Sequence, residues 1–173
     1  SSFYMWVVLA LKDYKMLTQR RYIDWVITTP TMLISTVIFM RYVEYKEKGE
    51  ETKTFYEIIE EEKDKLTQIV FFNWLMLAFG YMGESGKMCK STSIIMGYIF
   101  FAMSFSLIYG YAKETETGMH LFYFLTGVWS LYGVSAMLDE TKKNICYNLL
   151  DIVSKNFYGL YIYYKIYELR KLE

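Results

Sequence analysis

The sequence predicts an all-α membrane protein with five complete membrane-spanning helices and the end of one more. Apolar residues make up 54% of the 173 residues and aromatic residues 20%, against 22% charged residues. The charged residues are gathered in short clusters between long apolar runs, whereas a soluble domain of this length alternates apolar and charged positions throughout. Several apolar runs approach the ~20 residues that an α-helix needs to cross a bilayer core of ~30 Å. We therefore expect a protein that crosses the lipid bilayer several times.

The chain opens with a short apolar segment and then a longer one that contains proline. Residues 3–11 are too short to span a bilayer, and we interpret them as the end of a helix whose beginning is missing. The first complete span covers residues 21–41 and holds the only proline of the chain, Pro30. Proline removes one backbone hydrogen bond and bends a helix, and membrane helices tolerate it when a neighbour satisfies the freed carbonyl.

A charged segment at residues 44–65 follows the first span. Glutamates and lysines alternate there with an apolar side, which predicts an amphipathic helix that merges into the next span. The acidic run could attract cations, but a solvated charged face is the commoner explanation. The remaining expected spans are 66–82, 91–111, 119–138 and 144–168. No repeat or low-complexity linker divides the chain, so residues 1–173 are expected to form one domain.

Charge and cysteine content exclude little. Nineteen basic residues balance nineteen acidic residues, so the net charge gives no reason to expect a nucleic-acid partner. The two cysteines, Cys89 and Cys146, are expected to be unpaired thiols. The loop that contains residues 44–65 lies on the more acidic side of the chain, and charge alone leaves the membrane orientation undecided.

The first span carries polar residues that are costly inside a membrane. At ~100° per residue, Arg21, Asp24, Thr28 and Ser35 fall on one helix face. Serine and threonine often serve as hydrogen-bonding groups between membrane helices, which is enough to explain the hydroxyl residues. It does not explain Asp24, because a carboxylate in hydrocarbon becomes protonated or finds a cation.

The last helix offers that cation. Asp151 and Lys155 are four residues apart on one face, surrounded by apolar and aromatic residues. Desolvation disfavours the charged form of such a lysine, so it is either ion-paired or converted covalently, for example to a Schiff base with an aldehyde. A purely structural ion cluster is the alternative. Aromatic and small residues in other spans, such as Trp129, Tyr132 and Met76, are more often packing residues than ligand contacts.

Four motifs together resemble the microbial (type 1) rhodopsins. The run Arg21–Pro30 (RYIDWVITTP) is similar to their third-helix signature, and Asp151–Lys155 (DIVSK) is similar to their retinal-lysine motif in helix seven. Trp129–Tyr132 (WSLY) resembles the sixth-helix motif, and Asn73–Gly80 (NWLMLAFG) fits the fourth helix less specifically. The resemblance covers residues 18–165. The abundance of lysine and glutamate suggests the giant-virus branch of the family. It implies a seven-helix retinal-binding bundle, of which this chain carries the end of helix 2 and helices 3–7.

The resemblance also implies roles for individual residues. Lys155 would hold all-trans retinal covalently as a protonated Schiff base, Asp24 would be its counterion and proton acceptor, and Asp151 would be a second counterion. Arg21 would control the extracellular half, and Thr28 would hydrogen-bond Asp24. The other residues expected at the chromophore are Trp25, Thr29, Met76, Gly80, Trp129, Tyr132, Gly133 and Ala136. The family topology places the 44–65 loop in the cytoplasm.

Some positions depart from the family pattern. Ser35 stands where many outward proton pumps carry a carboxylic proton donor, so reprotonation should be slow or pass through water. Gly133 and Ala136 replace an expected proline and an expected aromatic residue. Acidic residues for proton release are not clearly matched, with Glu140 as the one candidate.

The resemblance implies ion transport or sensing rather than enzyme catalysis. An outward proton pump is the leading hypothesis, because Asp24 and Thr28 are both present. A light-gated cation channel is the alternative, since Ser35, Gly133 and Ala136 would loosen or hydrate the bundle. A photosensor that signals through residues 44–65 is the third. The expected partners are the bilayer, retinal and protons or small cations, and a homo-oligomer remains open.

Overall fold

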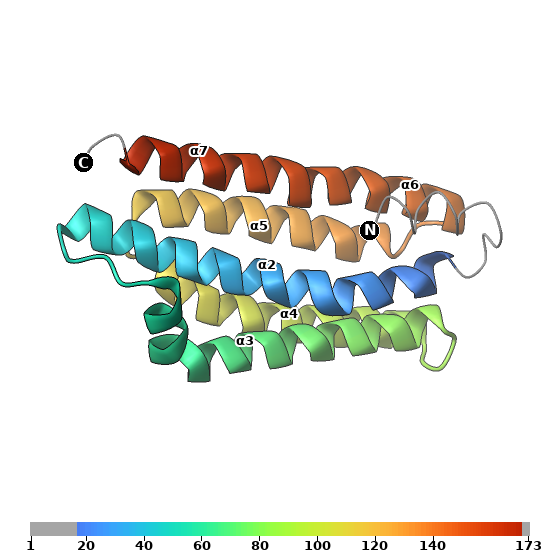
Figure 1. Cartoon of the computed structure of the whole chain (residues 1–173). Coiled ribbons are helices and arrows are strands. Elements are labelled where there is room, and N and C mark those ends of the chain that lie inside the picture. Colours follow the sequence, from blue (N-terminus) through green and yellow to red (C-terminus); the bar gives the residue numbers. More distant parts are fainter. Residues whose placement is uncertain (1–16, 171–173) are drawn as a thin grey trace.

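The described part of the chain is a bundle of antiparallel helices. The computed structural model describes residues 17–170, so the apolar segment at residues 3–11 lies outside it. The helices are α2 (Leu17–Lys48), α3 (Phe55–Glu84), α4 (Lys90–Ala112), α5 (Glu116–Ser135), α6 (Glu140–Asp151), η2 (Ile152–Phe157) and α7 (Tyr158–Arg170). Figure 1 shows them side by side, with α6, η2 and α7 joined into one rod. The predicted all-α fold is confirmed, and the sequence-derived spans were too short at both ends of α2 and at the start of α3.

Three of the described helices are long and apolar enough to cross a membrane, namely Thr18–Lys48 of α2, together with α3 and α4. Between the helices lies an apolar core whose central members are fully buried: Leu33, Val37, Ile69, Ile108 and Leu125. They come from α2, α3, α4 and α5. In a bilayer the lipid is as apolar as these side chains, so their close packing stabilises the bundle mainly through van der Waals contact.

Pro30 lies inside α2, as expected. Without an N–H at residue 30, the carbonyl of Val26 loses its partner in the helix. The indole Nε1 of Trp74, on α3, donates to this carbonyl oxygen at 3.0 Å. The prediction that a neighbouring helix satisfies the freed carbonyl is confirmed, and the proline becomes a point where α3 is tied to α2.

Replacing Trp74 with phenylalanine should therefore destabilise the bundle by about 1 kcal/mol, the usual net value of one such hydrogen bond. In a Pro30→Ala background the same replacement should cost less, because the N–H of residue 30 would then satisfy Val26 within the helix. Thermal unfolding of the four proteins in detergent, treated as a double-mutant cycle, measures the difference. Equal costs in both backgrounds would show that Trp74 acts through packing alone.

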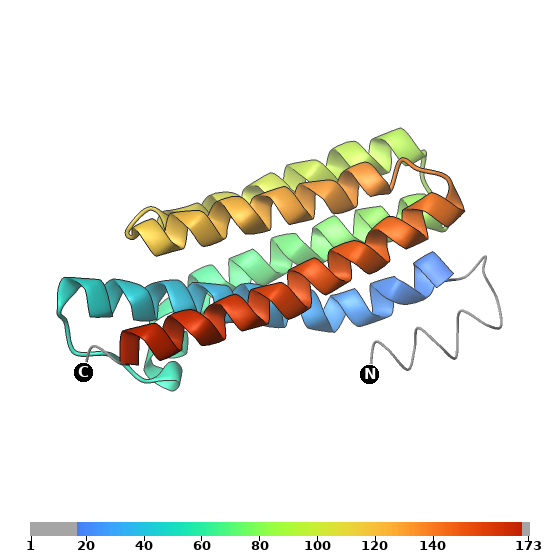
Figure 2. The ribbon, with the colours of Figure 1, turned by 90° about the horizontal axis from the view of Figure 1, so that it is seen from above.

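The charged segment 44–65 is divided between two helices. Its first residues complete α2, which ends at Lys48, and residues 55–65 form the first turns of α3. Thr54 caps α3 in a reciprocal arrangement: its backbone N–H donates to Glu57 Oε2 at 2.7 Å, and its hydroxyl accepts from the Glu57 N–H at 3.4 Å. Figures 1 and 2 show that the first turns of α3 are angled away from the rest of the helix, next to the end of α2.

Candidate functional site

Lys155 forms an ion pair with Asp24 inside the bundle. Its Nζ lies 3.0 Å from Asp24 Oδ2 on α2 and 3.6 Å from Asp151 Oδ1 on its own rod. The three side chains are between 19% and 25% exposed. The structure thus brings together the amine and the two carboxylates that the sequence singled out, although Asp24 and Lys155 are 131 residues apart in the chain.

Asp151 is shared by several groups. The hydroxyl of Tyr132 donates to its Oδ1 at 2.5 Å, and Arg21 Nη1 lies 3.4 Å from its Oδ2. The Tyr132 hydroxyl also lies 3.2 Å from Ser154 Oγ. Two positive charges, from Arg21 and Lys155, therefore balance two negative charges, from Asp24 and Asp151, which lowers the cost of keeping charge inside a membrane.

Arg21 is directed toward α6. Its side chain is 7% exposed, its Nε donates to Asn144 Oδ1 at 3.2 Å, and its Nη2 donates to Asn148 Oδ1. The two asparagines were not identified from the sequence, because asparagines one turn apart in a helix carry no specific signal without a partner. They fix the guanidinium between Asp151 and the beginning of α6.

Lys155 lies in a π-helical segment, η2 (Ile152–Phe157). A π-turn accommodates one more residue than an α-turn and is frequent at functional sites in membrane and soluble helices alike. The wider turn lies directly between α6 and α7. It changes the direction in which the Lys155 side chain leaves the rod, and no feature of the sequence predicted it.

The amine of Lys155 faces a cavity between the helices. Every residue that the sequence analysis assigned to the chromophore lies on its wall: Trp25, Thr29, Met76, Gly80, Trp129, Tyr132, Gly133, Ala136 and Lys155. Thr28 and Asp151 line it as well. The wall also contains four residues that were not predicted from the sequence: Tyr22, Tyr98, Tyr147 and Ser154. In a chain with 18 tyrosines, composition gives no means of selecting these three.

Aromatic rings form much of this wall. Trp25 makes edge-to-face contacts with Tyr132 and Tyr147, with ring centroids 5.4 and 5.1 Å apart. Tyr132 and Tyr147 stack at 5.7 Å. Rings that hold one another in fixed orientations give the cavity a rigid, apolar boundary on the Asp151 side.

Two glycines allow tyrosines to reach the cavity. A Cβ at Gly80 would lie 2.6 Å from the Tyr22 hydroxyl oxygen, and a Cβ at Gly133 would overlap the ring of Tyr98. The Tyr98 hydroxyl donates to the carbonyl of Ser130 at 2.8 Å. The expectation that Gly133 loosens the bundle is therefore wrong for this position, because Tyr98 fills the space that a larger residue would occupy.

The threonines of α2 bond mainly to their own helix. Thr28 Oγ1 donates to the backbone carbonyl of Asp24 at 3.0 Å, so the expected contact between these residues involves the main chain and not the carboxylate. Thr29 donates to the carbonyl of Trp25 and accepts from Asn73 Nδ2, both at 2.7 Å. The carboxylate of Asp24 thus accepts its hydrogen bond from Lys155 and not from Thr28.

Beyond the cavity, toward Arg41, the interior is apolar. Thr36 and Tyr158 join their hydroxyls at 2.6 Å, one turn past Lys155. The next side chains toward the end of the bundle include Val37, Met40 and Ile69, which are at most 1% exposed. Ser35 is exposed and donates to the carbonyl of Thr31. Ser35 therefore offers no carboxyl group to the interior, and among the described residues packed apolar side chains leave no open path from the cavity toward Arg41.

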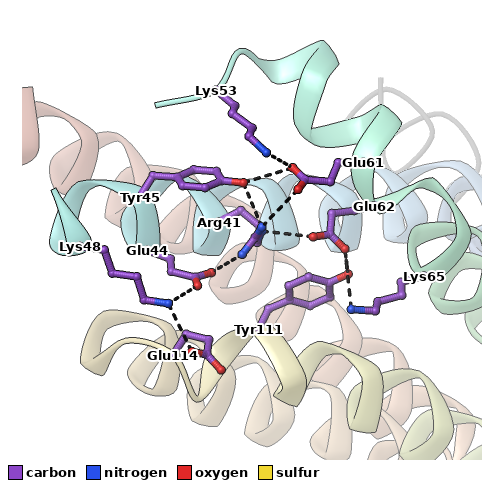
Figure 3. Close-up of polar contacts among 10 residues, drawn as sticks. All are labelled: Arg41, Glu44, Tyr45, Lys48, Lys53, Glu61, Glu62, Lys65, Tyr111 and Glu114. Carbon is purple, nitrogen blue, oxygen red and sulfur yellow. Dashed lines mark hydrogen bonds and ion pairs between the residues drawn. The ribbon is translucent and has the colours of Figure 1, made fainter. Parts of the chain in front are cut away.

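A cluster of charged residues lies at the end of the bundle (Figure 3). We call it the Arg41 cluster; its members are Arg41, Glu44, Tyr45, Lys48, Lys53, Glu61, Glu62, Lys65, Tyr111 and Glu114. Arg41 Nη1 lies 2.6 Å from Glu44, its Nη2 lies 2.9 Å from the Tyr45 hydroxyl, and its Nε lies 3.2 Å from Glu62. The cluster joins the end of α2 to α3, α4 and the turn after α4.

The glutamates of the Arg41 cluster are bound by lysine, arginine and tyrosine side chains. The Tyr111 hydroxyl donates to Glu62 Oε2 at 2.6 Å, and Lys48 binds Glu44 Oε1 at 2.5 Å. Lys53, in the connection between α2 and α3, donates to Glu61 at 2.7 Å, and this bond raises the pKa of Lys53. Four cations and four carboxylates offset one another's charge in this cluster.

The cavity at Lys155 fits a retinal. The group needs a primary amine for attachment, a carboxylate near that amine and a long apolar slot. Lys155, Asp24 and the ring-lined wall provide these three elements in one place.

Comparisons with known proteins agree with this geometry. The family model described as bacteriorhodopsin-like protein matches residues 1–169. The crystal structure of the viral rhodopsin OLPVRII is similar to the chain with a TM-score of 0.79 and 29% sequence identity, over 95% of this chain and 76% of that one. A search of curated proteins found no match. The sequence-based resemblance to microbial rhodopsins, and to viral ones in particular, is confirmed.

Proposed function

The chain belongs to the bacteriorhodopsin-like protein family, and from this premise we propose that it is a light-driven outward proton pump in which Asp24 accepts a proton from the nitrogen of Lys155. Membership of the family makes it an integral, multi-pass membrane protein with a retinal chromophore and a light-driven function. The finer assignment to proton pumping depends on the site. The observation that carries it is the 3.0 Å separation of Lys155 Nζ and Asp24 Oδ2.

Retinal would be held at Lys155 Nζ, in the cavity lined by Trp25, Trp129, Met76 and Gly80 among others. When bound there, it supplies light absorption and a light-driven fall in the proton affinity of that nitrogen. Asp24 Oδ2 is within direct hydrogen-bond distance, so it accepts the proton without an intervening group. Asp151 is instead bound by Tyr132 and Arg21.

Arg21 would respond to the transfer. While Asp24 is ionised, the guanidinium lies between the site and α6. Once Asp24 is neutral, the balance of charge around Arg21 changes, and its bonds to Asn144 and Asn148 direct it toward the beginning of α6. This movement would favour departure of the proton at the Arg21 end of the bundle.

Return of a proton to Lys155 must come from the Arg41 end. The hydroxyl of Ser35 does not ionise near neutral pH. The apolar layer around Met40 separates the site from the Arg41 cluster. The acids of that cluster are ion-paired. We therefore infer that reprotonation is the slow step of the cycle and needs water to enter the apolar layer.

Photocurrent recorded against membrane voltage tests the pump assignment. Cells expressing the full-length protein would be supplied with all-trans retinal and illuminated at a series of holding voltages. A pump gives an outward current at all voltages in this series, because light and not the ion gradient drives it. The current should be small, as expected for slow reprotonation.

Other outcomes would contradict the assignment. A current that reverses with the cation gradient would show a light-gated channel. A photocycle without current would favour a photosensor. Repeating the recording with an external pH change and with sodium replaced by a large organic cation separates proton movement from movement of other cations.

A further inference from the structure

At the Arg21 end of the bundle, a buried lysine binds two glutamates. Lys143, in the first turn of α6, is 2% exposed. Its Nζ lies 2.6 Å from Glu84 Oε2, at the end of α3, and 2.8 Å from Glu140 Oε2. Glu84 is 11% exposed and Glu140 45%. The three charges lie where a proton released at this end would have to pass.

This lysine cluster is connected to Arg21 by hydrogen bonds. Arg21 Nε donates to Asn144 Oδ1 at 3.2 Å, and Asn144 Nδ2 lies 3.3 Å from Thr18 Oγ1. Thr18 in turn donates to Glu140 Oε1 at 2.6 Å. A continuous path of polar groups therefore leads from Arg21 to the acid that the sequence analysis named as the release candidate.

Lys143 changes what these two acids can do. Two carboxylates close together without a cation cannot both ionise, and they would share a proton that could be given up. An ammonium bound to both offsets their mutual repulsion, and breaking either pair would leave a charge uncompensated. The other titratable groups that reach the cluster are Arg21, through Asn144, and the phenols of Tyr22 and Tyr147.

We propose that Lys143 is a positioning residue that keeps the exit free of a releasable proton, so that the pump takes up a proton before it releases one. This inference rests on the proposed function. The proton on Asp24 Oδ2 stays there while Lys155 is neutral, because no cation at Nζ then opposes it. When Lys155 regains a proton from the Arg41 end, the restored positive charge expels the proton from Asp24 past Arg21 to the Arg21 end.

The order of uptake and release can be measured with a flash and a soluble pH indicator. The full-length, retinal-loaded protein in lipid nanodiscs would be excited near neutral pH, and the indicator followed together with chromophore absorbance. We expect the bulk solution to become alkaline first and to recover afterwards. In Lys143→Met, Glu84 and Glu140 should share a proton, and acidification should move ahead of alkalinisation.

Control variants separate this role from a structural one. Lys142→Met removes the neighbouring lysine, whose side chain is 73% exposed and whose Nζ lies 3.1 Å from Asp139 Oδ2. This variant should leave the order of proton uptake and release unchanged. Adding Glu84→Gln to Lys143→Met removes the pair of acids and should restore late release. If Lys143→Met does not bind retinal, Glu140→Gln serves instead and should keep late release, because Lys143 and Glu84 remain paired.

Two results would overturn the inference. Acidification before alkalinisation in the unaltered protein would show a releasable proton despite Lys143. An unchanged order in Lys143→Met with an intact chromophore would show that the lysine does not control it. A photocycle with no bulk pH change in any variant would instead refute the proposed pump, and the inference with it.

Discussion

Lys155→Ala protein should remain colourless after incubation with all-trans retinal, with an essentially complete loss of the visible absorbance band. The amine of Lys155 faces the cavity and lies 3.0 and 3.6 Å from the carboxylates of Asp24 and Asp151, and attachment of the chromophore needs that amine. Absorbance of purified protein after removal of free retinal measures the effect. Normal colour in this variant would refute the assignment of the site.

A second lysine of the same cavity provides the matched control. Lys90, at the beginning of α4, also lines the cavity, but it is exposed and lies at a helix end. Lys90→Ala should keep its colour. Because Lys155→Ala leaves Asp24 without its cation, at a cost of about 3–5 kcal/mol for a buried pair, the variant should also be made with Asp24→Asn. Size-exclusion chromatography shows whether each variant is folded.

Asp24→Asn should shift the absorption band to longer wavelength and abolish light-driven transport. The carboxylate stabilises positive charge at the Lys155 nitrogen, and its removal raises the ground state of the chromophore relative to the excited state. A positioned proton acceptor contributes about 10²–10⁴-fold to a proton-transfer rate, so a loss of at least about 10²-fold is expected. Photocurrents and flash absorbance measure transport and transfer in the same protein.

Asp151→Asn is the comparison for this prediction. Asp151 is farther from Nζ and is held mainly by Tyr132 and Arg21, so its replacement should disturb the absorption band but leave transfer to Asp24 possible. Retained outward current in Asp24→Asn, or a greater loss in Asp151→Asn, would show that Asp151 is the acceptor.

The residues of the central site could be predicted because their chemistry is unusual in a membrane. A carboxylate at Asp24 and a lysine at Lys155 need each other, and the spacing of Asp151 from Lys155 puts both on one helix face. The aromatic wall followed only from the family resemblance. Tyr98 and Tyr147 could not be chosen from the sequence, because their role depends on which helices are adjacent.

Helix ends were predicted less well, for identifiable reasons. Thr54 and Glu57 have the spacing of a capping box, a signal that would have placed the beginning of α3 at Phe55. Residues 44–48 were expected to belong to an amphipathic helix that merges into the following span, yet they continue α2 to Lys48. There Lys48 pairs with Glu44 within the helix and with Glu114 of a neighbouring turn. The pairing of Lys143 with Glu84 joins separate helices and depends on their relative register, which a single sequence does not contain.

Pro30 has a mechanical consequence, because it lies on α2 between the chemistry at Asp24 and the Arg41 cluster. The eleven residues that follow Pro30, up to Arg41, form an arm of about 16 Å at the rise of an α-helix. Arg41 fastens the far end of this arm to α3 and, through Glu62 and Tyr111, to α4. A small tilt at the proline would be magnified along the arm, and the attached helix ends would move with it as a rigid body. We expect the proton-accepting half of α2 to stay still while the other half acts as a lever on the apolar layer through which water must enter.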